Sequence, residues 1–374
     1  MKPYPPVSGN TVRWIEGPEY YTRLLAALDS AQHTILFETY YCRDGEIFRS
    51  VMKALVRAAE RGVRVYVMLD AVGSAPVLRL ASRMLLRHGC HLRIFNPLRL
   101  SPWYSNLRRN HRKMCLVDGR LLLTGGWGLA DEWAGLKGQG LGMGFWMDAG
   151  VEVDGPVTAH WSDLFARTWR RCGGEVETMR PVAGDSGTSV CRLAFSQGRQ
   201  RQDLFRSLLQ RVRKARERVW IVTPYFVTSR RLRRALRHAA WRGVDVCVLV
   251  PGPYNDHPAV RYAAWQHISK LIRRGVRVYE YAPSFIHAKV VIVDDWASVG
   301  SCNLDHWTQM LALEANQEVW DRAFARQAAE RVSGWLRSAQ RLDRDPLAQA
   351  PLWVRWLARL IASVERTLYQ FWVA

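Results

Sequence analysis

The sequence has no Cys-x-x-Cys pair, no long apolar run and a shortage of acidic residues. Its 7 cysteines disfavour a disulfide framework or a zinc site, and they fit a reducing compartment. No run reaches the ~18 apolar residues that a membrane-spanning helix needs. The start of the chain carries no apolar signal segment, so we expect no secretory signal. The 33 acidic residues face 54 Lys and Arg, and the net charge of +21 predicts an anionic partner, either nucleic acid or an acidic membrane surface.

Helical and strand patterns alternate along the first hundred residues. Three helix-like segments each lead into a short apolar run: Pro18–Ser30 into Thr34–Tyr41, Glu46–Arg61 into Val63–Leu69, and Ala75–Arg87 into His91–Phe95. Strands that alternate with helices of this length are typical of βαβ units. The pattern therefore predicts an α/β fold with a largely parallel sheet.

The same order of segments recurs in the second half of the chain. The matching pairs are Ile35–Tyr41 with Trp220–Phe226, Arg61–Asp70 with Arg242–Pro251, and His88–Phe95 with Arg274–Tyr281. Three matches in one order indicate an internal duplication. We expect two similar halves, residues 1–180 and 190–345, with a small polar linker at 181–189 and a separate tail at 346–374.

The strongest motif, H-x-K-x4-D, occurs once in each half. It is formed by His111, Lys113 and Asp118 and again by His287, Lys289 and Asp294. Only 7 of the 54 basic residues are Lys, and two of them stand here, which indicates that a compact ammonium group is required. Side chains alternate along a strand, so the His and Lys of each motif share a face and the Asp supports them from the other.

Two histidines and two lysines that meet across a pseudo-dyad suit chemistry on a phosphoryl group. One neutral imidazole can attack phosphorus, and the other, when protonated, can donate to the departing alkoxide. The lysines can neutralise the non-bridging oxygens. No carboxylate cluster with metal-ligand spacing accompanies the motifs, so we expect no metal site.

The duplicated motif resembles that of the phospholipase D superfamily, and within it the chain is similar to the bacterial cardiolipin synthases without an N-terminal membrane anchor. The stretches that carry the resemblance are His111–Gly126, Leu129–Trp133, Asp148–Pro156, His287–Asp305 and Leu311–Val319. It implies two similar α/β halves, each a mostly parallel mixed sheet flanked by helices, with one shared active site at their interface. It also implies that two phosphatidylglycerol molecules give cardiolipin and glycerol through a phosphatidyl-histidine intermediate, without a cofactor.

The resemblance extends to residues that support the motifs. Ser301 and Asn303 match a turn that binds phosphate oxygens, whereas the first half departs from the pattern with Gly128 in place of Asn. The family also has one acidic residue per half that hydrogen-bonds the catalytic histidine of that half. Glu314 and Asp148 match these two positions.

Several functional alternatives remain open at this point. The family tendency favours His111 as the nucleophile, with His287 as general acid and then general base, but the asymmetry at Gly128 allows the reverse. The motifs do not encode the acceptor, so a hydrolase of the phospholipase D type is an alternative to a synthase. A phosphodiesterase acting on nucleic acid is a third and less favoured alternative.

The tail reads as an amphipathic helix over Leu352–Trp372. Its apolar face comprises Trp353, Trp356, Leu357, Leu360, Ile361, Val364, Leu368, Phe371 and Trp372. Such a helix, with arginines on its other face, suits an anionic bilayer surface, although a helix packed on the core has the same pattern. We therefore expect a peripheral protein on the cytoplasmic face of a bacterial cell membrane, with a tail that is dispensable for the chemistry itself.

Overall fold

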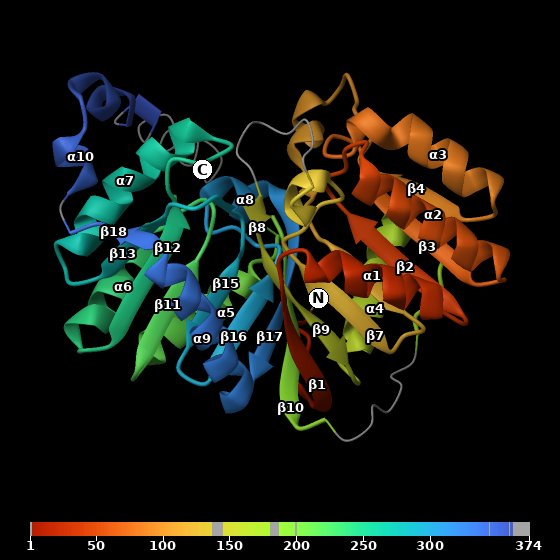
Figure 1. The fold of residues 1–374 in the computed structure, drawn as a ribbon, viewed down its shortest axis with the longest axis horizontal. Coiled ribbons are helices and arrows are strands. Elements are labelled where there is room, and N and C mark those ends of the chain that lie inside the picture. The colour runs from red at the N-terminus through yellow and green to blue at the C-terminus, as the bar shows by residue number, and fades with distance from the viewer. Residues whose placement is uncertain are drawn as a thin grey trace.

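The computed structural model describes residues 2–136, 145–179, 187–198, 200–343, 345–358 and 360–361 (Figure 1). The strands of the N-terminal half are β1 Val7–Glu16, β2 Thr34–Thr39, β3 Arg64–Asp70, β4 His91–Phe95, β5 Arg109–Asn110, β6 Met114–Val117, β7 Leu121–Gly125, β8 Trp146–Met147 and β9 Ala149–Asp154. Its α-helices are α1 Glu19–Ser30, α2 Glu46–Glu60, α3 Leu78–Arg87 and α4 Thr158–Arg171.

The C-terminal half repeats this order. Its strands are β10 Ser189–Gln197, β11 Arg218–Val222, β12 Asp245–Pro251, β13 Arg277–Tyr281, β14 Phe285–Ile286, β15 Val290–Val293, β16 Trp296–Gly300, β17 Ala312–Trp320 and β18 Ala339–Arg341. Its α-helices are α5 Asp203–Lys214, α6 Arg230–Trp241, α7 Pro258–Ile272, α8 His306–Leu311, α9 Arg322–Arg337 and α10 Pro346–Gln349. The segment 181–186 of the expected linker lies outside the described residues, and β10 begins at the end of that linker.

Both halves contribute to one 16-stranded sheet, which is centred on the antiparallel pair β1–β10. From this centre the order runs outward as β1-β9-β7-β6-β2-β3-β4 on one side and β10-β17-β16-β15-β11-β12-β13-β18 on the other. Each strand from β1 to β4 on this path thus has a counterpart at the same distance from the centre (Figure 1). The prediction of two similar α/β halves is confirmed.

The parallel pairing expected from the sequence holds only for the outer strands of each half. Strands β2, β3 and β4 are parallel, and so are β11, β12 and β13. The inner strands are antiparallel, because the strand that follows each His-x-Lys segment returns through a tight hairpin, β6–β7 or β15–β16, rather than through a crossover helix. The expectation of a mostly parallel sheet is therefore wrong for this inner part.

The helices and strands expected in the first hundred residues are present, with small differences at their ends. The expected helix Ala75–Arg87 begins as a 3-10 turn over Ala75–Val77, and the α-helix starts at Leu78. Pro76 lies in that turn, where its missing N–H group costs no helical hydrogen bond. The strand expected at Thr34–Tyr41 ends at Thr39, so that Tyr40 and Tyr41 lie in the loop that follows it.

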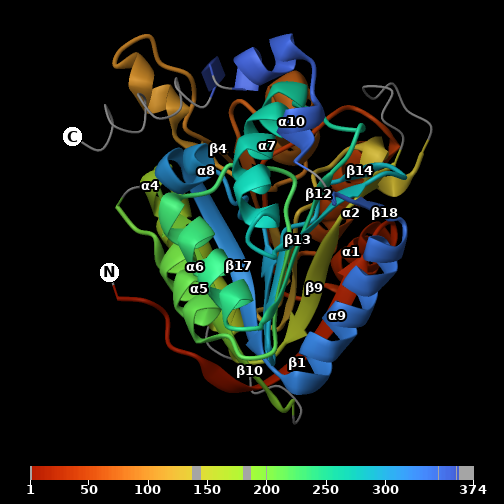
Figure 2. The ribbon, with the colours of Figure 1, turned by 90° about the vertical axis from the view of Figure 1, so that its left-hand side faces the viewer.

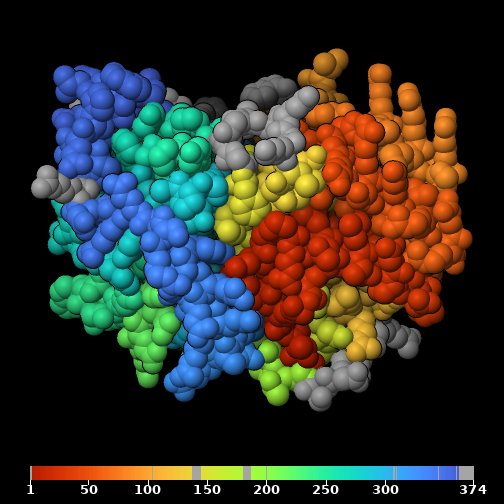
Figure 3. Space-filling model, viewed as in Figure 1, coloured from red at the N-terminus to blue at the C-terminus, as the bar shows by residue number. Residues whose placement is uncertain are grey.

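Three hydrophobic cores hold the fold together. Helices α1 to α3 cover one core in the N-terminal half, and α5 to α7 cover its counterpart in the C-terminal half. A third, central core joins the halves, and it includes Trp14 of β1, Trp161 of α4 and Trp335 of α9. Figure 3 shows β1 and α1 directly beside α9, where the Trp14 and Trp335 rings lie 6.1 Å apart. The two halves are therefore packed into one body.

The chain after α9 returns to the C-terminal half. Helix α10 packs on α7, and Ser269 Oγ donates to the Asp345 carboxylate at 2.5 Å just before α10. A further helical segment spans residues 352–358 and 360–361, and the rest of the expected tail helix lies outside the described residues. Within the described part of the chain, we find no helix that is both long and apolar enough to cross a bilayer.

Candidate active site

Two short strands carry the His-x-Lys segments across the boundary between the halves. Strand β5, just before His111, pairs in parallel with the start of β17, so that Asn110 lies opposite Leu313. Strand β14, just before His287, pairs in parallel with β8, so that Ile286 lies opposite Met147. His111 is therefore placed beside the residue that follows Leu313, and His287 beside the residue that follows Met147.

Each histidine is bound by a carboxylate of the opposite half. His111 Nδ1 lies 2.9 Å from Glu314 Oε1, and His287 Nδ1 lies 2.6 Å from Asp148 Oδ2. The expectation that Glu314 and Asp148 each bind the histidine of their own half is wrong. The pairing is crossed because the parallel strand pairs β5–β17 and β14–β8 place His111 beside Glu314 and His287 beside Asp148.

These carboxylates fix the protonation of the two imidazole rings. A carboxylate only accepts hydrogen bonds, so Nδ1 of each neutral histidine carries the proton and Nε2 keeps its lone pair. Burial lowers the pKa of His111 below its ordinary value, although Glu314 opposes this shift. Burial and the Lys289 ammonium together lower the pKa of His287 to about 3. In the unliganded protein both rings are therefore neutral near pH 7.

The two lysines lie beside their histidines as expected. Lys113 Nζ donates to the His111 carbonyl oxygen at 2.7 Å, and Lys289 Nζ lies 2.9 Å from each ring nitrogen of His287. Burial lowers the pKa of Lys113 to about 7 and that of Lys289 to about 8. Lys289 also lowers the pKa of His111, and Lys113 that of His287, so all four side chains share one electrostatic environment.

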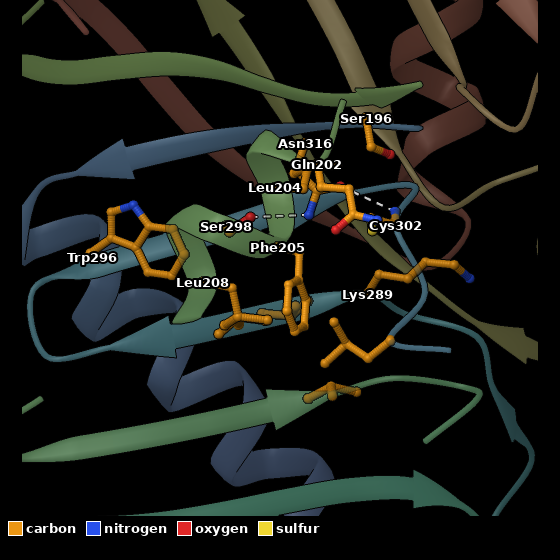
Figure 4. Close-up of a pocket in the computed structure, with 14 residues that line it drawn as sticks. Ser196, Gln202, Leu204, Phe205, Leu208, Lys289, Trp296, Ser298, Cys302 and Asn316 are labelled. Atoms are coloured by element: carbon orange, nitrogen blue, oxygen red, sulfur yellow. Dashed lines mark hydrogen bonds between the residues drawn. The ribbon is translucent and has the colours of Figure 1, made fainter. Parts of the chain in front are cut away.

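Packing holds the aliphatic part of Lys289 in place. Figure 4 shows this side chain at the edge of a small cavity of about 30 Å³, with its amine directed away from Phe205 and Leu208. Beside it, Asn316 accepts from the Cys302 backbone N–H at 3.1 Å and donates to Ser298 Oγ at 3.0 Å. These bonds tie the turn after β16 to the neighbouring strand β17.

The turn after β16 places both of its predicted phosphate-binding residues near the histidines. Ser301 Oγ donates to Glu314 Oε2, so that this hydroxyl orients the partner of His111. Asn303 lines the cavity that contains His111, and its buried Oδ1 has no hydrogen-bond partner among the described residues. Asn303 is thus available to a ligand, whereas Ser301 acts through Glu314.

The corresponding turn of the first half is built differently. A Cβ atom at Gly126, the position that matches Ser301, would lie 2.2 Å from Asp148 Oδ1, so only Gly fits there. A Cβ atom at Gly128 would lie 2.7 Å from the Tyr41 carbonyl oxygen, which excludes the expected Asn. The buried Trp133 replaces the missing hydroxyl, because its Nε1–H donates to Asp148 Oδ2 at 3.1 Å.

Asp118 and Asp294 lie away from the histidines, at the opposite ends of β6 and β15. Asp118 accepts from the backbone N–H groups of Gln32, His33 and Thr34 at 2.8 to 2.9 Å. Asp294 does the same for Arg216, Glu217 and Arg218 at 2.9 to 3.0 Å. They support the motifs by fixing the start of β2 and of β11, and the structure gives them no contact with the histidines.

Several aromatic residues of the site escaped the sequence analysis. The Tyr40 ring lies edge-on to His111 at 4.8 Å, and Tyr225, its counterpart in the repeat, lines the same cavity. The rings of Trp133 and Trp146 lie 5.3 and 5.7 Å from His287. The two tyrosines had a signal, since both follow the matching strands β2 and β11 in the duplication. The tryptophans gave less: Trp133 ends the stretch Leu129–Trp133 that carries the family resemblance, and Trp146 lies in β8, a strand of only two residues.

A cavity of about 600 Å³ opens beside His111. Its lining combines polar side chains, among them Arg109, His257, Asn303 and Asp305, with apolar side chains of α7, α8 and the helical segment after α10. The His111 side chain is 17% exposed, against 8% for His287. His111 is therefore the more accessible of the two from this cavity.

The comparison with known families agrees with this geometry. A family model described as "Cardiolipin synthase, PLD-like domain" matches residues 24–134 and 208–335. The chain belongs to this family. Cardiolipin synthase A of Pseudomonas putida (strain GB-1) is 32% identical over 371 residues, which cover 96% of this chain and 76% of that protein. Major cardiolipin synthase ClsA of Bacillus subtilis (strain 168) is 29% identical and covers 94% of this chain and 73% of that protein.

Solved structures show the same fold. The phosphatidylserine synthase of Haemophilus influenzae Rd KW20 has a TM-score of 0.73 at 14% sequence identity, and the match covers 98% of this chain and 96% of that one. The resemblance to the phospholipase D superfamily that the motifs indicate is thus confirmed at the level of family and fold.

Proposed function

We propose that this protein is a cardiolipin synthase that transfers a phosphatidyl group between two phosphatidylglycerol molecules. The observation that carries the proposal is the pair of crossed His–carboxylate contacts, each with its own lysine, together with the cavity that opens beside His111. The family relationship supports the same reaction.

In the first step His111 acts as the nucleophile. Its Nε2 lone pair attacks the phosphorus of phosphatidylglycerol, and the bond from phosphorus to the glycerol headgroup oxygen breaks. Glu314 stabilises the imidazolium that results, because it accepts from Nδ1. His287 donates a proton to the leaving glycerol, while Lys113 and Lys289 neutralise the phosphate oxygens. The negative charge of the bound phosphodiester raises the pKa of His287 from its low unliganded value, so that its ring takes up from solvent the proton that it then donates.

In the second step a second phosphatidylglycerol replaces glycerol. Its headgroup hydroxyl gives its proton to the now neutral His287, and its oxygen attacks phosphorus. The bond from phosphorus to His111 Nε2 breaks, which releases cardiolipin and leaves His111 neutral and His287 protonated, as at the start of the first step. His287 returns its proton to solvent when the product leaves. Water in the same place would give phosphatidic acid, so acceptor access decides between synthesis and hydrolysis.

A lipid substrate fits the cavity better than a nucleic acid does. Its lining includes Arg109, Tyr40 and Tyr225, but it also has aliphatic side chains of α7, α8 and the helical segment after α10, whereas nucleic-acid grooves are lined mainly by cations and stacking aromatics. The excess of arginine suits the cytoplasmic face of a bacterial membrane. Attraction to anionic lipids there contributes about 1 kcal/mol of binding free energy for each basic residue near the surface.

The test is to incubate the purified protein with phosphatidylglycerol in mixed micelles and to identify the products by mass spectrometry. We expect cardiolipin and glycerol in equal amounts, and neither product from the His111→Ala variant. Phosphatidic acid with glycerol and no cardiolipin would identify a hydrolase. Cleavage of DNA in a parallel reaction, without any lipid product, would overturn the lipid assignment.

A further inference from the structure

The cavity beside His111 is lined by both polar and apolar side chains. The polar ones include Arg109, His257, Asn303, Asp305 and Thr308. The aliphatic ones include Val227, Val260, Ala263, Leu311 and Ile361. A volume of about 600 Å³ is of the size that binds small ligands, which is ~300–1,000 Å³. A ligand with a polar end at His111 and an apolar chain matches this mixed lining.

The helical segment after α10, residues 352–358 and 360–361, forms one wall of this cavity. Its inner face is buried, with Val354 3% and Ala358 0% exposed, and Ile361 packs on the core of the C-terminal half. Leu360 and Ile361 line the cavity directly. The segment therefore contributes to the lining of the cavity, although it lies near the C-terminus.

The outer face of the same segment is apolar and exposed to solvent. Leu352 is 71% exposed, Trp353 61%, Trp356 68% and Leu360 62%. Leu107 also lines the cavity, and the loop that leads to it exposes further apolar side chains, Leu98, Leu100 and Tyr104. Figures 1 and 2 place this loop, drawn in orange, and the blue segment around α10 at the same upper edge of the molecule. Two segments that line the cavity thus also expose apolar side chains at this edge of the molecule.

We infer that the cavity binds a fatty acyl chain of a phospholipid and that the helix 352–361 joins this pocket to the bilayer. Its inner face forms the pocket wall, and its outer face inserts into the membrane surface together with the loop at 98–104. The inference rests on the proposed function, since it places the lipid phosphate at His111 and the chain between α7 and the helix. It predicts, against the expectation that the tail is dispensable for the chemistry, that removal of Leu360 and Ile361 lowers activity on every lipid substrate, because both side chains line the cavity.

Binding measurements test the occupant of the cavity without any turnover. The probes are 1-hexanoyl- and 1-decanoyl-lysophosphatidylglycerol, titrated into the protein by calorimetry below their micellar concentrations. Each buried methylene tightens binding about fourfold, so the longer chain should bind about two hundredfold more tightly. Val260→Phe fills the aliphatic part of the cavity and should remove most of this difference. Ala259→Phe adds the same ring at the neighbouring exposed position of α7 and should keep it.

The inference would be overturned if the affinity did not depend on the length of the acyl chain. It would also be overturned if Val260→Phe kept the same dependence as the unchanged protein. Cardiolipin synthesis with chain-independent binding would refute only the acyl pocket. Chain-dependent binding without any cardiolipin synthesis would refute only the proposed function.

A second comparison separates the two faces of the helix. Ile361→Ser changes the inner face and should lower activity on both dihexanoyl phosphatidylglycerol and long-chain vesicles by at least tenfold. The double variant Trp353→Ser, Trp356→Ser changes the outer face and should lower vesicle activity at least tenfold more than activity on the dihexanoyl lipid. Thermal unfolding of both variants checks that they are folded. Equal behaviour of the two variants on the two substrates would show that the faces have no separate roles.

Discussion

The replacement of a serine by Trp133 in one half of the site predicts a specific kinetic defect. Trp133→Phe removes the indole N–H that binds Asp148 and leaves an aromatic ring beside His287. Asp148 is fully buried and ionised, because its contacts with His287 and Lys289 outweigh the effect of burial and keep its pKa low. A hydrogen bond to such a charged group contributes about 1.5–3 kcal/mol. Since each ~1.4 kcal/mol is a factor of ten, kcat should fall by about 10- to 100-fold.

The matched control is Trp161→Phe. Trp161 is also fully buried, and its Nε1–H donates to Gln317 Oε1 at 2.9 Å in the central core, without a contact to either histidine. Both variants should lose about 1–3 kcal/mol in the free energy of unfolding, measured by urea denaturation. Only Trp133→Phe should lower kcat for cardiolipin formation, with KM changed less than threefold. If the two variants lose kcat equally, Trp133 stabilises the fold and has no role in positioning Asp148.

Four further outcomes are expected. His111→Ala and His287→Ala should each lower kcat by at least a thousandfold, and a phosphatidyl adduct trapped on His287 in the His111→Ala protein would reverse the assigned roles. Glu314→Gln should reduce kcat more when combined with Asp148→Asn than with His111→Ala, since Glu314 and His111 act as one unit; equal effects in steady-state assays would contradict the crossed pairing. Asp118→Ala should lower the free energy of unfolding by about 2–4 kcal/mol with less than a threefold change in kcat, because it removes backbone hydrogen bonds far from the histidines. The value of kcat/KM should fall above pH 7 to 8, as Lys113 and Lys289 lose their charge. It should also fall on the acidic side, as His111 takes up a proton. A profile that is flat from pH 6 to 9 would contradict these pKa shifts.

The duplication and the His-x-Lys motifs were predictable because they leave periodic or repeated patterns in the sequence. The alternation of strands and helices located β2, β3 and β4, and the repeat located their counterparts β11, β12 and β13. The separation of Asp118 from His111 followed from the alternation of side chains along a strand. These features depend on residues that are close together in the chain.

The crossed pairing was not predictable, because it depends on strands of only two residues. Strands β5, β8 and β14 are too short to show any periodicity, yet they decide which carboxylate each histidine meets. The hydrogen bond from Trp133 to Asp148 was not predictable either. Trp133 does the task of Ser301, but it does not stand at the position of the repeat that matches Ser301. The burial of one face of the helix at 352–361 was also invisible, because an amphipathic pattern does not tell a membrane from a core.

The crossed contacts have a consequence for the newly made protein. The N-terminal half leaves the ribosome before the C-terminal half is made. At that stage it contains His111 and Lys113, but Glu314, whose carboxylate orients His111, has not yet been synthesised. A nascent or prematurely terminated chain can therefore rest against the membrane without attacking its lipids. Catalytic competence arrives only when β17 has been added to the sheet, so synthesis of the enzyme and the onset of its activity are separated in time.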